Sequence, residues 1–311
     1  MKIAVSAASF CKNKILRSEL LEYFPQTQFL MSQGVPRHDE LTNFYKDAQG
    51  VIVGTEKIDL KLLEQFPKIK IISKYGVGTD NIDLNALDKL NIKFGFMAGV
   101  NKLSVAELTL GFMLALSHNI FLKGIPLKSG YWDKNGGIQL SNRSIGIIGC
   151  GNVGYQLLKL LKPFKCELLV NDIEDKQCLI KPFEAKQTSK LEIFEKCQFI
   201  TLHTPLTNDT KHMINEETLS KIRHDAFVIN TARGQLVDQI ALKHALKNNQ
   251  LAGAALDVYE MEPPTDVEFL SLPQLITTPH IGGNSMEAQL NMGRSAIRHL
   301  VEFFKNKTTV T

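Results

Sequence analysis

The stretch Ser144–Leu161, SIGIIGCGNVGYQLLKLL, decides the class of fold because three spaced glycines join a strand pattern to a helix pattern. A β-branched run precedes the glycines, and leucines follow them at helical spacing. The spacing G-x-G-x-x-G at such a turn is typical of a dinucleotide-binding βαβ unit, in which the helix N-terminus faces a pyrophosphate. The cofactor contacts predicted from this loop are Gly149, Gly151, Asn152, Val153 and Gly154.

An acid at the end of the next predicted strand, CELLVND, strengthens this interpretation. Asp172 follows the glycine loop by about the 20 residues expected of the acid that accepts hydrogen bonds from the adenosine ribose. Glu174 and Asp175 stand nearby and would repel a 2′-phosphate, so the sequence predicts NAD rather than NADP. Glycines alone also occur in turns that bind nothing, and the strand, the helix and the acid therefore carry the prediction.

The rest of the chain alternates short β-branched runs with helical patterns, first over residues 1–96 and again after residue 144. This alternation predicts two α/β domains, each with a parallel sheet covered by helices. Between the two series, residues 102–121 (KLSVAELTLGFMLALSHNIF) predict a long apolar helix that is buried in its own domain or against another subunit. Met286–Lys305 predicts an amphipathic helix that packs back onto the first domain.

Composition excludes several classes of function. The 311 residues are 44% hydrophobic and 22% charged, and the formal charge of +4 is scattered, so no nucleic-acid partner is expected. No run reaches the ~18 apolar residues that span a bilayer. The five cysteines show neither a disulfide framework nor ligand spacing, which predicts no metal and a reducing, cytoplasmic location.

Candidate catalytic residues follow the predicted strands of the second series. Ligands of open parallel sheets bind beyond the carboxyl ends of the strands, and the motifs there bring Arg233, Glu262 and His280 to one edge. Taken singly, each has an ordinary alternative: a surface arginine, a solvated loop acid or a core histidine. A second glycine segment, Tyr75–Asp83 (YGVGTDNID), lacks the third glycine and the long helix of a dinucleotide loop.

The motifs GCGNVG, HTPLT, NTARG, AGAALDV, MEPP and TPHIGG, in this order and with Asp172, resemble the D-isomer-specific 2-hydroxyacid dehydrogenase family. GVGTDNID and SVAEL in the first half match as well. The resemblance implies a Rossmann-type NAD-binding domain (residues 99–280) inserted into a flavodoxin-like substrate domain (residues 1–98 and 281–311), with the active site between them. Hinges are then expected near 98–102 and 279–283, where Pro279 and two glycines shape the backbone around His280.

The resemblance also assigns roles. Arg233 would hold the carboxylate and polarise the ketone, His280 would exchange a proton with the substrate oxygen, and Glu262 would orient the histidine and raise its pKa. Further cofactor contacts implied by the family are Thr204, Thr231, Ala232, Arg233, Asp257, His280, Gly282 and Gly283. The implied substrate contacts are Lys74, Gly76, Val77, Gly78 and Arg233.

The chain departs from the family pattern in places. Asn152 replaces a frequent basic residue, Met97 stands where a threonine often touches the cofactor, and no regulatory C-terminal extension is expected. The predicted activity is NAD-dependent hydride transfer to or from a D-2-hydroxy acid, with 3-phosphoglycerate favoured over glyoxylate or hydroxypyruvate because Lys74 could contact a phosphate. A catalytically silent NAD-binding regulator is the alternative. A homodimer is expected through the helix Leu103–Leu116.

Overall fold

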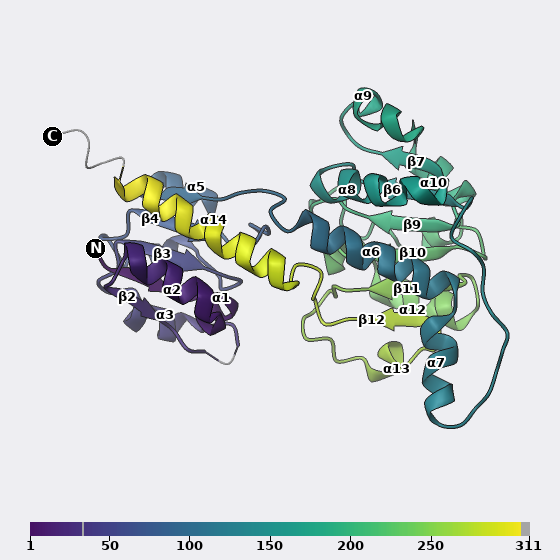
Figure 1. Cartoon of the computed structure of the whole chain (residues 1–311), viewed down its shortest axis with the longest axis horizontal. Helices are drawn as coiled ribbons and strands as arrows, with labels where there is room; N and C mark the ends of the chain where they lie inside the picture. Colours follow the sequence, from purple (N-terminus) through teal and green to yellow (C-terminus); the bar gives the residue numbers. More distant parts are fainter. Residues whose placement is uncertain (33, 306–311) are drawn as a thin grey trace. The chain divides into compact units, whose positions relative to one another are not determined.

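The computed structural model describes residues 1–32 and 34–305, which form two compact units (Figure 1). The first contains Met1–Asn101 and the chain from Gly283 onward, and the second is Lys102–Gly282. The sequence-based limits, 98/99 and 280/281, lie a few residues before both changes of unit. Each unit is built on a parallel sheet, which confirms the predicted α/β class.

The first unit holds a five-stranded parallel sheet in the order β2-β1-β3-β4-β5, the order of flavodoxin-like folds. Its strands are β1 Ile3–Val5, β2 Thr27–Phe29, β3 Gly50–Val53, β4 Ile71–Lys74 and β5 Lys93–Gly95. Its helices are α1 Ala8–Lys12, α2 Lys14–Tyr23, α3 His38–Phe44, α4 Leu60–Leu63, α5 Leu84–Lys89 and α14 Met286–Lys305.

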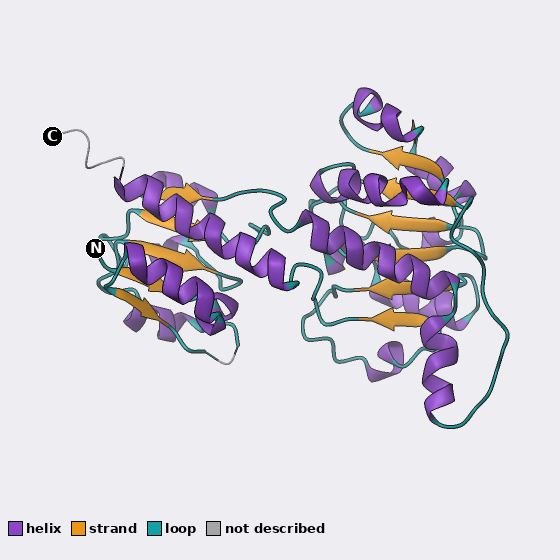
Figure 2. Cartoon of the chain, viewed as in Figure 1, coloured by secondary structure: helices purple, strands orange, loops and turns teal. Residues whose placement is uncertain are grey.

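Helices cover both faces of this sheet because each buries one apolar stripe (Figure 2). On one face α14 packs with α1 and α2, as its amphipathic pattern predicts: Leu300 and Phe304 are buried, and the Ser73 hydroxyl donates to the Ala296 carbonyl at 2.9 Å. Helix starts follow local capping rules. Asp83, for example, accepts a hydrogen bond from the Ala86 N–H and begins α5.

The second unit holds a seven-stranded parallel sheet in the order β12-β11-β10-β9-β6-β7-β8. Read from β8, this order is the Rossmann order with one added strand, and the topological switch lies between β6 and β9. The strands are β6 Ser144–Ile148, β7 Glu167–Asn171, β8 Lys186–Gln187, β9 Phe199–Leu202, β10 Phe227–Asn230, β11 Gly253–Leu256 and β12 Leu275–Thr277.

Helices again lie on both faces, with α6 and α8 in one apolar cluster and α10 to α13 in the other. Their bounds are α6 Lys102–Ser117, α7 Ile120–Lys128, α8 Asn152–Leu161, α9 Gln177–Ile180, α10 Lys190–Lys196, α11 Glu216–Leu219, α12 Gln239–Lys247 and α13 Val267–Leu270. Short 3-10 turns cover η1 Lys162–Phe164, η2 Lys181–Phe183 and η3 Gly234–Leu236.

The predicted continuous helix over residues 102–121 is wrong at its end. Helix α6 stops at Ser117, and Asn119 adopts a left-handed conformation with φ of 54°, which asparagine tolerates better than most residues. Helix α7 then starts at an angle of 69° to α6. Within the part of the chain that the structure describes, no single helix has the length and apolarity to cross a membrane, and only this bent pair has them together.

Candidate active site

The glycine loop follows β6 at the switch point of the second sheet. Gly149 has φ of +96°, and a Cβ on it would lie 2.6 Å from the His203 carbonyl oxygen, so only glycine fits. A Cβ on Gly154 would lie 2.2 Å from the Gly149 carbonyl oxygen, which explains the close approach of α8 to the loop. Nothing lies within 4 Å of a Cβ on Gly151. The loop therefore leaves open space at the N-terminus of a ten-residue helix, where an anion is stabilised.

Asp172 lies directly against this loop. Its carboxylate accepts hydrogen bonds from the Cys150 N–H at 2.8 Å and from the Glu174 N–H at 3.0 Å. The acidic cluster expected here is weaker than the sequence suggests, because Lys176 forms an ion pair with Glu174. Repulsion of a 2′-phosphate would therefore come mainly from Asp172 and Asp175.

Two threonines directly follow the neighbouring strands β9 and β10. The Thr204 hydroxyl, after β9, is buried and has no hydrogen-bond partner among the described residues. The Thr231 hydroxyl, after β10, pairs with the Thr109 hydroxyl of α6 at 3.0 Å. Burial lowers the pKa of the neighbouring His203 to about 3, so its imidazole is neutral. An open glycine loop, an acid at the end of β7 and an unsatisfied hydroxyl together fit a dinucleotide.

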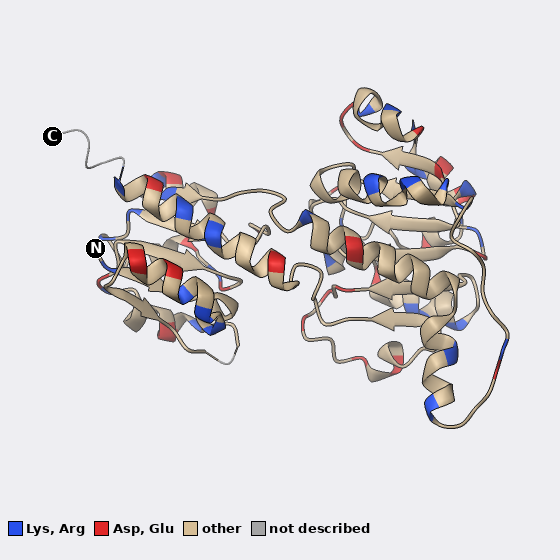
Figure 3. Cartoon of the chain, in the orientation of Figure 1, with Lys and Arg blue, Asp and Glu red and all other residues tan. Residues whose placement is uncertain are grey.

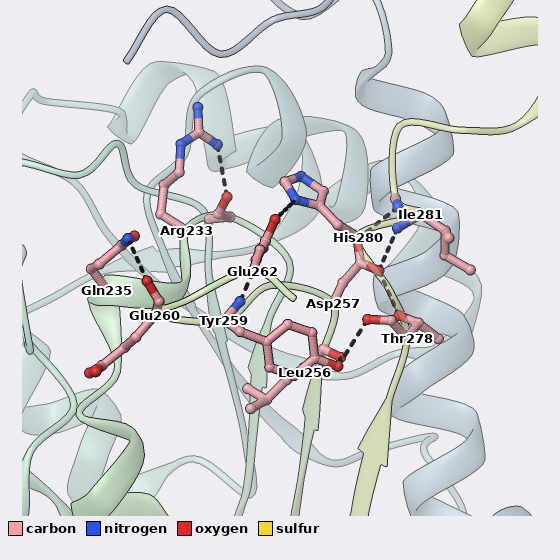
Figure 4. Close-up of polar contacts among 12 residues, drawn as sticks. Arg233, Gln235, Leu256, Asp257, Tyr259, Glu260, Glu262, Thr278, His280 and Ile281 are labelled. Carbon is pink, nitrogen blue, oxygen red and sulfur yellow. Dashed lines mark hydrogen bonds and ion pairs between the residues drawn. The ribbon is translucent and has the colours of Figure 1, made fainter. Parts of the chain in front are cut away.

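His280 and Glu262 come into direct contact at the edge formed by the loops after β11 and β12 (Figure 4). The His280 Nδ1 lies 2.7 Å from the Glu262 Oε2, and the side chains are 54% and 38% exposed. The second carboxylate oxygen of Glu262 accepts from the Tyr259 N–H at 3.2 Å. This pairing fixes the orientation of the imidazole and leaves Nε2 on the side of the ring away from Glu262.

The electrostatic consequence is a histidine that holds its proton more tightly than usual. The hydrogen bond with Glu262 raises the pKa of His280 above its ordinary 6.5; burial opposes this, and the charge of Asp257 supports it. Burial alone would raise the pKa of Glu262, but the hydrogen bond and charge of His280 outweigh it and lower the pKa. Both shifts favour the imidazolium–carboxylate pair.

The backbone around His280 has a feature that the sequence did not predict. His280 itself is left-handed, with φ of +53°, whereas Gly282 and Gly283 are not among the positive-φ residues of the described chain. The glycines are needed for close approach instead: a Cβ on Gly282 would lie 2.9 Å from the Asp257 carboxylate. A left-handed non-glycine residue stores strain that the surrounding contacts must hold.

Asp257 supplies those contacts. Its carboxylate is 1% exposed and accepts from the Ile281 N–H and the Gly282 N–H, both at 2.7 Å, and from the Thr278 hydroxyl at 2.6 Å. A carboxylate can accept roughly four hydrogen bonds, and three of those that Asp257 accepts come from the segment on either side of His280. Asp257 therefore holds the segment 278–282 in place around His280, a role that the sequence did not predict.

Arg233 stands in the turn between β10 and η3. Its guanidinium donates to the Ala232 carbonyl at 2.8 Å, and in Figure 4 its side chain lies on the same side of the loops as Glu262 and His280. Asn230 is fully buried and stabilises this turn through its side-chain amide. The amide oxygen accepts from the Ala232 N–H at 3.0 Å, and the amide nitrogen donates to the Arg233 carbonyl at 2.7 Å. Gly234 packs directly against the Tyr259 backbone.

Asn230 was missed by the sequence analysis, although a signal existed. An asparagine at the end of a strand commonly accepts from the N–H two residues later, which is the contact seen with Ala232. Only its strand-terminal position marked it, and nothing local showed that it supports the arginine turn.

Comparison with known proteins agrees with this geometry. Residues 110–282 match the model of the D-isomer specific 2-hydroxyacid dehydrogenase NAD binding domain. The chain is 36% identical to glyoxylate reductase of Thermofilum pendens over 283 residues, covering 88% of this chain and 83% of the relative. This chain belongs to the D-isomer specific 2-hydroxyacid dehydrogenases. It is an NAD-dependent enzyme, and its second unit is the NAD-binding domain.

Two further dehydrogenases show the range of the family. The chain is 38% identical to D-3-phosphoglycerate dehydrogenase of Methanocaldococcus jannaschii, covering 82% of this chain but only 49% of that protein. The structure of D-lactate dehydrogenase from Aquifex aeolicus, complexed with NAD and lactic acid, superimposes with a TM-score of 0.86 at 26% identity, covering 98% of this chain and 96% of the other.

The dehydrogenase's remaining predicted site residues lie in the first unit. Gly76, Val77 and Gly78 follow β4 in a partly exposed loop, where Gly76 has φ of +123°. Lys74 is 5% exposed and donates to the Gly54 carbonyl and to the Asn81 amide oxygen. The side chain expected to reach a substrate phosphate is therefore bound within its own unit.

The charged side chains of both units are of mixed sign (Figure 3). Figure 3 shows Lys and Arg interspersed with Asp and Glu within each unit. Over residues 1–32 and 34–305, no three His, Cys, Asp or Glu side chains are grouped so that they could hold a metal ion.

Proposed function

We propose that this dehydrogenase interconverts a short 2-oxo acid and its D-2-hydroxy acid with His280 as the proton donor and acceptor. The observation that carries the proposal is the 2.7 Å contact between His280 Nδ1 and Glu262. Bound NADH supplies the hydride that forms the new C–H bond at C2. As a hydride reaches C2, the C=O π electrons would pass to oxygen, and the Nε2 of protonated His280 would deliver the proton that completes the hydroxyl group.

Arg233 would hold the substrate carboxylate and polarise the ketone with its planar guanidinium. The backbone N–H groups of Gly76, Val77 and Gly78 resemble an anion-binding nest that would take the same carboxylate. NAD would lie along the glycine loop, with Asp172 on the ribose. The other proposed cofactor contacts are Thr204, Thr231, Ala232, Asp257, Gly282 and Gly283.

We expect the D-2-hydroxy acid to be 3-phosphoglycerate, which the sequence favours, or the product of glyoxylate or hydroxypyruvate reduction. NADH oxidation should be followed at its absorbance band with 3-phosphohydroxypyruvate, hydroxypyruvate and glyoxylate. We expect turnover with at least one of them and its loss in His280→Asn. NADH binding without turnover on any 2-oxo acid would refute the proposal and favour a silent NAD-binding regulator.

We also propose a homodimer, but through a different helix from the one expected. Much of α6 is buried against its own unit, with Phe112, Met113 and Leu116 in the core. Helix α7 has no buried residue and exposes Ile125 (60%), and Trp132, which follows the helix, is 73% exposed. A second copy would cover this apolar face. Light scattering should show a dimer, and Ile125→Asp should shift it to monomer; a monomeric wild type at micromolar concentration would contradict the proposal.

A cytoplasmic location remains a proposal. The five cysteines, Cys11, Cys150, Cys166, Cys178 and Cys197, are all unpaired, which supports a reducing compartment. A cysteine-reactive probe applied to intact cells and to lysate would test it.

A further inference from the structure

Two charged side chains are buried at the carboxyl edge of the first sheet. Lys74, the last residue of β4, is 5% exposed, and Glu56, just after β3, is 1% exposed. Both bind the peptide groups of Gly54: the Lys74 ammonium donates to the Gly54 carbonyl, and Glu56 Oε2 accepts from the Gly54 N–H at 2.9 Å. Buried charges are tolerated when they are compensated in this way.

Asn81 ties this pair to the loop that carries the proposed carboxylate nest. Its Oδ1 accepts from Lys74 at 2.9 Å, and its amide nitrogen donates to the carbonyls of Gly54 at 3.1 Å and Glu56 at 2.5 Å. The Ile58 N–H donates to the Asn81 carbonyl at 2.8 Å. The loops after β3 and β4 are therefore joined by side-chain and backbone bonds on either side of residues 76–80.

The buried network continues below Glu56. The Ser6 hydroxyl donates to Glu56 Oε1 and lies 2.5 Å from the Tyr45 hydroxyl. Burial, together with the charge of Glu56, raises the pKa of Tyr45 well above its ordinary value, so the phenol stays neutral. If Lys74 turned towards a ligand, its bonds to Gly54 and Asn81 would break, and the buried edge that also holds the Glu56 carboxylate would lose its cation. Such a loss is strongly unfavourable in a protein interior.

We propose that Lys74 and Asn81 are positioning residues that set the shape of the 76–80 loop, and that the substrate taken there is a 2-oxo acid recognised by its carboxylate, with no second anionic group bound by Lys74. This inference rests on the proposed function, in which the nest of residues 76–78 binds that carboxylate. It favours glyoxylate and hydroxypyruvate over the phosphorylated acid, because the cation expected for a phosphate is already bound within the fold.

The first test is independent of activity. Hydrogen exchange of the peptide covering residues 75–82 should be measured in the whole protein for wild type, Lys74→Met and Asn81→Ala. We expect exchange at least tenfold faster in both variants, because the bonds that join the two loops are lost. Lys57→Met is the matched control, since this neighbouring lysine is 81% exposed and pairs with Asp59 at the surface. Unchanged exchange in both loop variants would overturn the positioning role.

The second test uses kinetics. Lys74→Met should raise KM by a similar factor, about tenfold, for whichever of glyoxylate, hydroxypyruvate and 3-phosphohydroxypyruvate the wild type accepts, with the Kd for NADH unchanged. A loss confined to the phosphorylated acid would assign Lys74 to the phosphate and overturn the proposal. If Lys74→Met does not fold, the double variant Glu56→Gln, Lys74→Met removes the uncompensated charge and is measured in its place. Failure of the wild type on all three acids would refute the proposed function, while the exchange result would still decide the positioning role.

Discussion

Replacing Gly234 by alanine tests how closely the Arg233 turn must pack against the loop that carries Glu262. A Cβ at this position would lie 1.9 Å from the carbonyl carbon and oxygen of Tyr259, and real Cβ contacts essentially never fall below 3.0 Å, so the two segments must separate by about 1.1 Å. Both partners are backbone, and no change of rotamer relieves the overlap. The displacement therefore passes to Arg233 on one side and to Glu262 on the other, since the Tyr259 N–H binds Glu262.

A misplacement of about 1 Å at catalytic groups lowers rates by about 100-fold. We therefore expect kcat/KM for the 2-oxo acid to fall about 100-fold in Gly234→Ala, which corresponds to about 2.7 kcal/mol of transition-state stabilisation. NADH affinity should change much less, because the glycine loop and Asp172 lie at other strands of the sheet. Steady-state kinetics, NADH fluorescence titration and a thermal melt of the same preparation separate a local displacement from loss of folding.

Gly136→Ala is the matched control, because nothing lies within 4 Å of a Cβ at that exposed position. It should behave as wild type in all three measurements. If Gly234→Ala binds NADH and keeps kcat/KM within threefold of wild type, the packing of the arginine turn does not control catalysis, and the reasoning from this contact is refuted.

Three further predictions concern the proposed site. His280→Asn should leave NADH binding nearly intact and lower the reduction rate by roughly two to four orders of magnitude, and comparable single-turnover rates would exclude His280 as the acid. Because Glu262 raises the pKa of His280, the acid form persists to higher pH; Glu262→Gln should therefore move the alkaline limb of the reduction profile to lower pH, and an unmoved limb would contradict the pairing. Wild type should prefer NADH, and Asp172→Ala should relax that preference when kcat/KM is measured with NADPH; equal efficiency of the wild type with both cofactors would show that Asp172 does not discriminate.

Local patterns were enough to predict the architecture. The alternation of β-branched runs with amphipathic stretches predicts two parallel sheets, because the crossover that returns the chain to start the next parallel strand is usually a helix. The glycine loop could also be predicted locally: Gly149 and Gly154 meet steric demands of one strand-to-helix turn, Gly151 leaves space beside the helix N-terminus, and the acid follows at a set distance. The carboxyl ends of parallel strands meet at one edge, which placed Arg233, Glu262 and His280 together, and the resemblance to the family then selected these three as the catalytic set.

Other features depended on contacts between residues distant in sequence. The break between α6 and α7 lies at the left-handed Asn119, whose side-chain amide donates to the Gly136 carbonyl at 3.3 Å. The left-handed His280 is held by Asp257 from another strand end, and neither Pro279 nor the following glycines indicated it. Asn230 looked like any strand-terminal polar residue until the arginine turn above it was placed.

Lys74 shows most clearly which properties follow from the sequence and which depend on the tertiary structure. Its position at the end of a strand, beside a glycine loop, follows from the sequence, and a free ammonium there would suit a phosphate. The hydrogen-bond partners of the ammonium depend on how the loops after β3 and β4 approach each other. That approach places Gly54 and Asn81 within hydrogen-bond distance of Lys74. Burial then gives those contacts their strength, because a charge removed from water needs partners that periodicity and spacing do not specify.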